Sequence, residues 1–464
     1  MTSFSPLIWL DKSVSHLASL ADDPSIDWKN IVVACTWLQT AFEVYLYSRQ
    51  LRCYSLPSPP PEIKDHLDST TFSKAQKYGK DKCRLELLKT VWSQLLSWGL
   101  ISGGFYVRAW GWSGELMRKF GLSEERVITH SLIWFTILSL FPSLLSLPWE
   151  YYRTFVIEER HGFNKSSVGL WIKDQLVTYS LVGVIGLPLL AGLLRIIGWA
   201  GRAFVPWLMV FLISIQLLLQ IIFPTFIQPL FNKLTPLPEG ELRTMVESLA
   251  KKLNFPLTHL YQIDGSKRSS HSNAYFYGLP WSKHIVIYDT LIEKSTPTEV
   301  EAVLSHELGH WYFSHPTKLL IAAQFHILLN ISAFLIFMHN KSLYSSFGFD
   351  PRLASPSLGQ RQPVFISFVL YQMVLDPLDT IVKFFLNAQT RKYEYQADEF
   401  GVQLGKKDAL CSSLIKLHVT NLSSPHNDWL YSMYHHSHPV LPERLRAMDN
   451  NKSTPLKLKG EKEL

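Results

Sequence analysis

The sequence is short of cysteine and of charge, and both shortages narrow what the chain can be. Its four cysteines, Cys35, Cys53, Cys83 and Cys411, lie far apart along 464 residues. They show no C-x-x-C spacing, so neither a disulfide framework nor a thiolate metal site is indicated. Charged residues make up only 18% of the chain, against roughly 25% in a typical soluble protein. This composition argues against an ordinary soluble protein.

Apolar residues account for 47% of the chain, which also carries 15 Trp and 19 Tyr. Trp and Tyr gather where a bilayer meets water, so these numbers favour a membrane protein. Apolar stretches of roughly 17–25 residues are long enough to cross a bilayer as helices. The sequence holds seven candidates, at residues 31–47, 85–107, 127–147, 176–197, 205–223, 319–338 and 364–386.

These segments divide the chain into four regions. Residues 1–231 form a membrane region with five spans, residues 232–318 are hydrophilic, residues 319–386 carry two more spans, and residues 387–464 form a hydrophilic tail. Connections on one side of the membrane hold ten Lys and Arg, and those on the other side hold thirty-two. Because Lys and Arg mark the cytosolic side, both hydrophilic regions are predicted to face the cytosol. The net charge of +7 then reflects loops beside anionic lipid rather than binding to nucleic acid.

The pentapeptide HELGH, residues 306–310, follows an amphipathic pattern that is typical of a helix. On a helix, His306 and His310 lie one turn apart on one face, so both imidazoles can bind one ion. Two neutral imidazoles and one carboxylate suit Zn²⁺ and leave a fourth position for water. Glu307 lies at the edge of that face and is the candidate general base. The motif also arises by chance, so the metal-site hypothesis requires a third ligand.

Glu394 and Asp398 are the candidates for that third ligand, and they are spaced i, i+4 in the hydrophilic tail. One carboxylate can complete the metal shell while the other accepts a hydrogen bond from the far nitrogen of a ligand histidine. The same spacing is common on a solvated helix face. Two predicted spans separate HELGH from Glu394, and this even number places both on the cytosolic side. The orientation therefore favours the ligand role.

Two short stretches in the first hydrophilic region predict β-strands. Residues 272–277 and 284–288 are rich in aromatic or β-branched side chains, which favour strands. Because few residues separate them, a hairpin is predicted. A small β-hairpin is thus expected within an otherwise helical protein.

Beyond HELGH, the chain resembles the type I CAAX prenyl proteases, which are integral-membrane zinc metallopeptidases. The resemblance extends over most of the chain and rests on residues 78–82, 155–165, 229–232, 266–278, 289–291, 306–311, 391–400, 437–439 and 443–445. Thr390 stands where the family often has serine, a change without an evident chemical consequence. Together these stretches are far more specific than HELGH alone.

The resemblance implies an all-α polytopic membrane protein whose seven transmembrane helices form a barrel around a large chamber. A gluzincin-like zinc protease domain lies on the cytosolic or nucleoplasmic side of the endoplasmic reticulum and inner nuclear membranes. Family members remove the last three residues of proteins that end in a prenylated Cys-aliphatic-aliphatic-X (CAAX) sequence, and some make a second cut upstream. The expected partners are prenylated CAAX proteins or peptides and the bilayer. We expect a monomer with one Zn²⁺ per chain and no nucleic acid.

The resemblance also assigns roles to the residues singled out above. It implies that His306, His310 and Glu394 are the zinc ligands and that Glu307 is the general base. Asp398 is implied to accept a hydrogen bond from a ligand histidine without contacting the metal.

Three further residues receive roles from the same resemblance, and a fourth, Arg444, is a candidate from its chemistry. His438 is implied to stabilise the developing oxyanion, although a surface histidine is the other interpretation of the run 435–438. Asn273 and Ala274 match the strand along which substrate lies, and an edge strand can hold a peptide by main-chain hydrogen bonds. Arg444 is either a bidentate anchor for a substrate carboxylate or a member of a structural ion pair.

Two other functions fit parts of the sequence. A quality-control protease that clears misfolded or translocon-jammed membrane proteins would use the same chamber and strand. A non-catalytic membrane chamber or scaffold would have no need of HELGH together with Glu394. Replacing Glu307 by Gln separates the classes, since a scaffold would keep its function and a protease would lose it.

Overall fold

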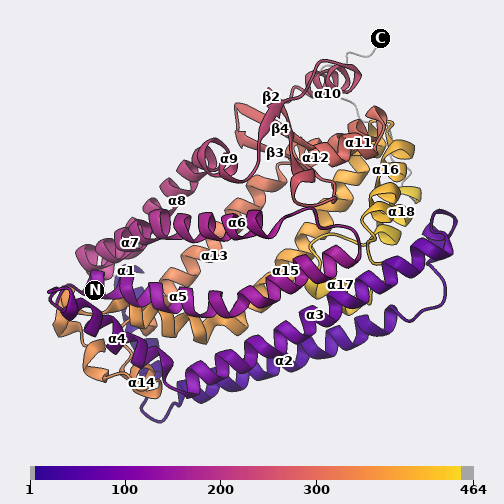
Figure 1. Ribbon diagram of the computed structural model, residues 1–464. Coiled ribbons are helices and arrows are strands. Elements are labelled where there is room, and N and C mark those ends of the chain that lie inside the picture. Colours follow the sequence, from indigo (N-terminus) through magenta and orange to yellow (C-terminus); the bar gives the residue numbers. More distant parts are fainter. Residues whose placement is uncertain (1–5, 451–464) are drawn as a thin grey trace.

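The computed structural model describes residues 6–450, and most of them are helical (Figure 1). The first part of the chain forms α1 (Pro6–Ala21), α2 (Trp28–Cys53), η1 (Pro61–His66), α3 (Ser69–Ser102), α4 (Phe105–Lys119), α5 (Val127–Tyr152), η2 (Arg153–Glu158), α6 (Val168–Leu181), η3 (Val182–Gly186), α7 (Leu187–Ala200), η4 (Gly201–Ala203), α8 (Phe204–Ile222), η5 (Phe223–Ile227) and α9 (Gln228–Phe231). The second part forms β1 (Leu234–Pro236), α10 (Glu241–Lys252), β2 (Leu257–Ile263), η6 (Gly265–Lys267), β3 (Ala274–Leu279), β4 (Ser282–Tyr288), α11 (Asp289–Lys294), α12 (Pro297–Tyr312), α13 (His315–Phe337), α14 (Lys341–Ser346), η7 (Pro351–Ala354), η8 (Pro356–Arg361), α15 (Val364–Gln403), α16 (Lys407–Thr420), α17 (Trp429–His435) and α18 (Leu441–Asp449).

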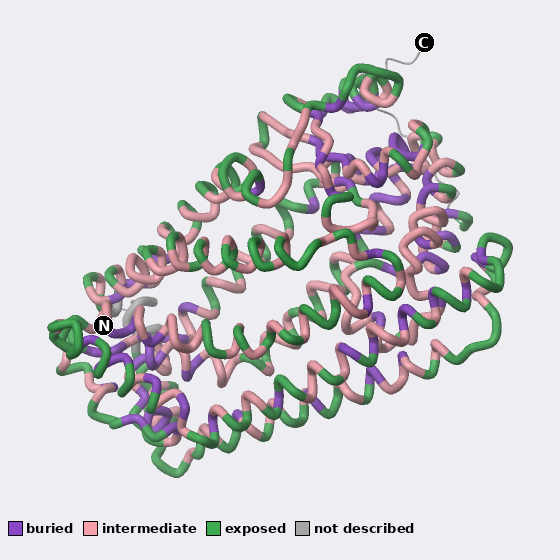
Figure 2. The backbone as a smooth tube through the Cα atoms, in the orientation of Figure 1, coloured by how far each residue is buried: buried purple, intermediate pink, exposed green. Residues whose placement is uncertain are grey.

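Five helical stretches within residues 6–450 are long and apolar enough to cross a membrane. They are Val127–Glu158, Val168–Ala200, Phe204–Phe231, His315–Phe337 and Val364–Gln403. Most residues of their apolar windows are not buried inside the protein, as the pink and green helices of Figure 2 illustrate. Apolar surface that the protein leaves uncovered is what a bilayer-facing helix requires. The chain is therefore a multi-pass membrane protein, and these stretches contain five of the seven predicted spans.

The other two predicted spans, residues 31–47 and 85–107, lie in the long helices α2 and α3, which are more polar than the five. The predicted end of the second span is wrong, because α3 stops at Ser102 and α4 starts at Phe105. Gly104, between them, has a φ of 66°. That left-handed conformation suits glycine and breaks the helix.

Two hydrophobic cores lie at opposite ends of the molecule (Figures 1 and 2). One contains Val246, Ile285 and Leu304 and joins the sheet to α10 and α12. The other surrounds Trp134 and Tyr344, near α4 and α14. The long helices α2, α3, α5 and α15 run between the two ends (Figure 1). The sheet and the HELGH helix thus lie together at one end of a long helical assembly.

The β-sheet has four strands in the order β1-β2-β4-β3. The predicted hairpin is present, since β3 and β4 pair antiparallel through Leu279 and Ser282 at the turn. The sequence did not predict β1 and β2, of which β2 pairs parallel to β4 and β1 antiparallel to β2. This order leaves β3 at the edge of the sheet, where it also packs against α12.

Helix α12 has strong local signals at its start. Thr296 and Glu299 form a reciprocal capping box, with Pro297 at the first helical position, and both features favour a helix that begins here. Val300, Leu304 and Leu308 then enter the core beneath the sheet. That burial fixes the opposite side of α12 against α15, the helix that carries Glu394.

Candidate metal centre

The three predicted metal ligands converge between α12 and α15. His306 Nε2 lies 3.2 Å from His310 Nε2, and His310 Nε2 lies 3.2 Å from Glu394 Oε1. His306 Nε2 lies 3.5 Å from Glu394 Oε2. Ligand atoms roughly 2.0–2.1 Å from a tetrahedral zinc ion are spaced about 3.3 Å apart. These three groups therefore fit around one ion of that size.

Glu394 gives a second reason to expect a cation. Its side chain is only 2% exposed, and its Oε2 accepts no hydrogen bond from residues 6–450, although His438 Nδ1 lies 2.9 Å away. A buried carboxylate oxygen without a hydrogen bond costs free energy unless a positive charge balances it. Arg444 Nη1 lies 3.8 Å from this oxygen, beyond hydrogen-bond distance, and a metal ion beside Glu394 would supply a closer positive charge.

Asp398 lies behind the first ligand histidine. Its Oδ1 accepts a hydrogen bond from His306 Nδ1 at 2.8 Å, which directs Nε2 of the same ring toward Glu394 and His310. Burial would lower the pKa of His306, but hydrogen bonds to Asp398 and Glu394 raise it to about 9. A proton and a metal ion therefore compete for this imidazole.

Arg444 forms an ion pair rather than facing an open pocket. Its Nε lies 2.8 Å from Asp398 Oδ2, and its Nη2 lies 2.6 Å from Oδ1. Both contacts together are the bidentate geometry in which guanidinium binds carboxylate most strongly. The structure thus shows Arg444 in the ion-pair arrangement, where it holds the carboxylate that orients His306.

Glu307 has surroundings unlike those of the ligands. Its carboxylate makes no hydrogen bond or ion pair with any residue in the described range 6–450. Burial raises the pKa of Glu307, and the neighbouring His306 and His310 lower it only in part. An unpartnered carboxylate with a raised pKa, one residue from a metal ligand, is suited to accept a proton.

His438 reaches the site from the segment between α17 and α18. Its side chain is 64% exposed, and its Nδ1 lies 2.9 Å from Glu394 Oε2. Asn273 and Ala274 lie at the start of the edge strand β3, where Ala274 pairs with Ile287 of β4. Because β4 occupies only one side of β3, the other edge can accept an extended peptide.

The sequence did not identify a contact to the second ligand histidine. His315 is buried at the start of α13, and its Nδ1 lies 3.0 Å from His310 Nδ1. Its Nε2 lies 3.0 Å from Gln396 Oε1, and its ring stacks on Tyr393 with centroids 4.0 Å apart. An amide oxygen only accepts, so His315 Nε2 carries the hydrogen and Nδ1 of the neutral ring accepts from His310. This arrangement leaves His310 Nε2 free for a metal.

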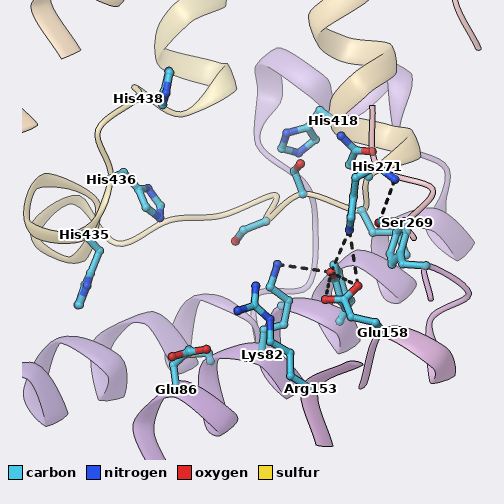
Figure 3. Close-up of a pocket in the computed structure, with 18 of the residues that line it drawn as sticks. Lys82, Glu86, Arg153, Glu158, Ser269, His271, His418, His435, His436 and His438 are labelled. Carbon is cyan, nitrogen blue, oxygen red and sulfur yellow. Dashed lines mark hydrogen bonds and ion pairs between the residues drawn. The ribbon is translucent and has the colours of Figure 1, made fainter. Parts of the chain in front are cut away.

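The largest cavity described lies beside His438 and has a volume of about 1020 Å³ (Figure 3). Its lining combines apolar surface with many polar side chains, contributed by α3, η2, α6, the segment before β3 and the chain from the end of α16 to the start of α18. In Figure 3, the segment that carries His435, His436 and His438 lies apart from Lys82, Arg153 and Glu158, and all six residues line the cavity. A space of this size can enclose several residues of an extended peptide.

Family models cover nearly all of the chain. One, described as the CAAX prenyl protease N-terminal region with five membrane helices, matches residues 50–233. A second, described as peptidase family M48, matches residues 236–452. The second match contains the metal-binding residues and the sheet, and its family implies a metal-dependent peptidase.

Individual proteins match over their whole length. CAAX prenyl protease 1 of Saccharomyces cerevisiae is 39% identical, over 93% of this chain and 98% of that protein. The human CAAX prenyl protease 1 homolog is 36% identical, over 91% of this chain and 95% of its own length. A crystal structure of S. mikatae Ste24p superimposes with a TM-score of 0.85 at 40% identity, covering 92% of this chain and all of that one. The chain thus belongs to the CAAX prenyl protease 1 family of M48 metallopeptidases.

Proposed function

We propose that this chain is a zinc endopeptidase that removes the last three residues of isoprenylated CAAX proteins. The observation that carries the proposal is the convergence of His306, His310 and Glu394, with Glu307 unpartnered beside them. The relatives' names and the length of the match support the substrate class.

His306, His310 and Glu394 would hold the zinc ion, and Asp398 and His315 would keep the two imidazoles in the required tautomer. When bound there, zinc supplies a Lewis acid that polarises a carbonyl and lowers the pKa of a water molecule. Glu307 then takes the proton of the attacking water and returns it to the leaving amine.

His438 and β3 complete the proposed machinery. Because His438 is exposed and next to Glu394, its imidazole can donate to the oxyanion that develops as the carbonyl is attacked. Asn273 and Ala274 would present main-chain groups to an extended substrate along the free edge of β3. Main-chain recognition tolerates many side chains, which suits a loosely defined CAAX sequence.

We further propose that α2 and α3 cross the membrane, giving seven spans in a barrel around a chamber. The start of α2 contacts α14, where Trp28 N donates to Ser346 Oγ at 3.3 Å. The connection between α2 and α3 contacts α18 at the end that carries the metal site, where Glu62 pairs with Arg446 at 3.1 Å. The two helices thus run the full length of the molecule, beside the helices that are apolar enough to span.

The proposed setting is the endoplasmic reticulum and inner nuclear membranes, with the metal site facing cytosol or nucleoplasm and the chain acting as a monomer. The distribution of Lys and Arg supports that orientation. The edge strand β3 would also allow a second, upstream cut. A substrate held along this edge by main-chain hydrogen bonds can extend past it in both directions, whatever its length.

One observation also favours a broader protease. A cavity of about 1020 Å³ beside a sequence-tolerant edge strand would accept misfolded membrane proteins as readily as CAAX tails. The proposal that the substrate must be prenylated therefore needs its own test.

The test uses purified, detergent-solubilised protein and a farnesylated CAAX peptide. Wild type and Glu307→Gln are compared, with a non-prenylated peptide as control and zinc content measured alongside. We expect the wild type to release the tripeptide from the farnesylated peptide, with about one zinc per chain. Glu307→Gln should keep the zinc and lose cleavage by ~10²- to 10⁴-fold, the usual contribution of a general base.

Other outcomes would change the conclusion. Equal cleavage of both peptides would favour the quality-control function. Absence of both zinc and cleavage would overturn the enzymatic proposal and support a non-catalytic scaffold.

A further inference from the structure

Two cationic side chains in the large cavity have no function in the proposed mechanism. Lys82 extends from α3 and Arg153 from the start of η2, and both line the cavity. In the view of Figure 3 both side chains extend into the space shown, and the charge of Arg153 acts on Lys82.

The acidic groups of the same cavity already have partners. Asp174 binds Arg268 through two contacts of 2.8 Å. Glu158 accepts from the Tyr78 hydroxyl at 2.8 and 2.9 Å. Glu86 pairs with Lys89 at 3.6 Å. None of these carboxylates forms a direct ion pair with either cation within the described residues, although the Tyr78 hydroxyl bridges Glu158 and Lys82.

By contrast, the guanidinium of Arg153 makes no ion pair or hydrogen bond with any residue between 6 and 450, while its backbone N–H donates to the carbonyls of Trp149 and Glu150. Among residues 6–450, the ammonium of Lys82 hydrogen-bonds only to the Tyr78 hydroxyl, at 3.5 Å, and lies 4.5 Å from the centre of that ring. Burial lowers the pKa of Lys82; the charge of Glu158 opposes that shift, while the charge of Arg153 adds to it. An anion placed between the two cations would relieve their mutual repulsion.

The direction of the edge strand leads toward these cations. The segment just before β3, which contains Arg268, Ser269 and His271, lines the cavity. A peptide that pairs antiparallel with β3 runs opposite to it, so its C-terminal end passes Asn273 and enters the cavity. Three extended residues beyond the cleaved bond reach roughly 10 Å. Such a peptide ends in a free carboxylate.

We propose that Lys82 and Arg153 form the subsite that binds the free C-terminal carboxylate of the substrate, an inference that rests on the proposed function. The guanidinium of Arg153 can hold the carboxylate through two hydrogen bonds, and Lys82 supplies a second charge beside it. A carboxylate fixed at this point sets how many residues lie between the chain end and the metal centre. The subsite would therefore help to determine that the product is a tripeptide.

The experiment compares two farnesylated peptides that differ only at the C-terminus, one a free acid and the other an amide. We expect the wild type to cleave the acid with a kcat/KM ~10- to 100-fold above that of the amide, the value of a charge-assisted hydrogen-bonded contact. Arg153→Gln and Lys82→Met should each lose activity on the acid and leave the amide unchanged. Arg153→Lys should restore part of the preference.

Lys77→Met is the matched control, because Lys77 lies on the same helix, is exposed and does not line the cavity. It should keep the full preference for the acid. Equal cleavage of acid and amide by the wild type would overturn the subsite and leave the proposed function intact. Equal losses on both peptides in the variants would also overturn it, since they would indicate a structural role. Failure of the wild type to cleave either peptide would refute the proposed function itself.

Discussion

At the level of single residues, the site distinguishes two neighbouring carboxylates by their surroundings. Glu394 lies among His306, His310 and His438 and is nearly inaccessible to solvent. Glu307 has no partner within the described residues, and burial raises its pKa. A carboxylate held by three imidazoles is fixed for metal binding, whereas an unpartnered one is free to exchange a proton.

The raised pKa of Glu307 predicts how activity depends on pH. A general base works only when ionised, so activity is present above its pKa and is lost as pH falls through it. The acid limb of kcat/KM should therefore lie above the ordinary glutamate value of about 4.3. The check is kcat/KM against pH, with zinc content measured at each pH because His306 also binds protons. An acid limb at or below 4.3 with full zinc content would contradict the assignment.

His315 predicts an effect on metal affinity. His315→Leu removes the acceptor for His310 Nδ1, and we expect zinc affinity to fall by about 10- to 100-fold, as for other groups that orient metal ligands. His315→Asn places an amide oxygen near the same position and should recover much of the affinity. Zinc competition with a chelator measures both.

A matched control for His315 exists at the other end of the protein. His130 is also buried and stacks on an aromatic ring, with its centroid 3.6 Å from that of Trp110. His130→Leu should lower thermal stability and leave zinc affinity unchanged. If both leucine variants reduced zinc affinity alike, the effect would be general destabilisation and not the contact to His310.

The sequence predicted which side chains meet at the candidate metal centre because their spacing along helices determines which side chains share a face. It did not predict the contact of His315, because a reversal of the chain brings that residue back to His310. Helix α12 ends at Tyr312, Ser314 adopts a φ of 56°, and α13 then starts. A turn of that shape depends on what packs around it, here the ring of Tyr393.

At the level of elements, the spacing between α12 and α15 decides whether ligands on two helices can meet. Gly309 lies at their contact, and a Cβ there would be 3.1 Å from both Ala397 Cα and Phe400 Cβ. These distances are shorter than ordinary van der Waals contact, so a larger residue must separate the helices. Gly309 therefore sets how closely Glu394 approaches the two histidines.

Gly309→Ala should lower the free energy of unfolding by about 1–3 kcal/mol and weaken zinc binding, because the ligands move apart. Thermal unfolding and chelator competition measure the two effects. Gly111→Ala is the control, since nothing lies within 4 Å of a Cβ at that helical position; it should leave zinc affinity unchanged and raise the free energy of unfolding by about 0.5–1 kcal/mol. A stability loss at Gly309 with unaltered zinc affinity would show that the ligand spacing is set elsewhere.

The elements differ in how far their sequences predict them. The hairpin of β3 and β4 was predicted because aromatic and β-branched residues mark both strands and the turn is short. β1 was missed because three residues carry too little pattern. β2 was missed because its parallel pairing with β4 joins segments that local sequence does not connect.

At the level of the whole molecule, α2 and α3 are less apolar than the five candidate spans, and polar groups lie between these two helices. Gln94 of α3 is buried and donates to Thr36 of α2 at 3.0 Å. Such a contact satisfies polar atoms inside a helix pair and lowers the mean hydropathy of both helices. The amino-acid composition of α2 and α3 therefore differs from that of the five apolar helices, although α2 and α3 run alongside those helices.

The orientation of the chain in the membrane can be tested with N-glycosylation acceptor loops inserted at three exposed points. Beside Arg352, 89% exposed, the loop should be glycosylated, because that connection carries few basic residues and is predicted to face the lumen. Beside Glu239, 85% exposed, it should remain unmodified on the cytosolic side.

An acceptor loop beside the exposed Leu56, between α2 and α3, decides the number of spans. If both helices cross, this connection lies with the metal site and stays unmodified, as the contact between Glu62 and Arg446 requires. Glycosylation there would mean that α2 and α3 do not span and that only the five apolar helices do. Glycosylation beside Glu239 would be more serious, since it would place the metal centre in the lumen, away from prenylated proteins made in the cytosol.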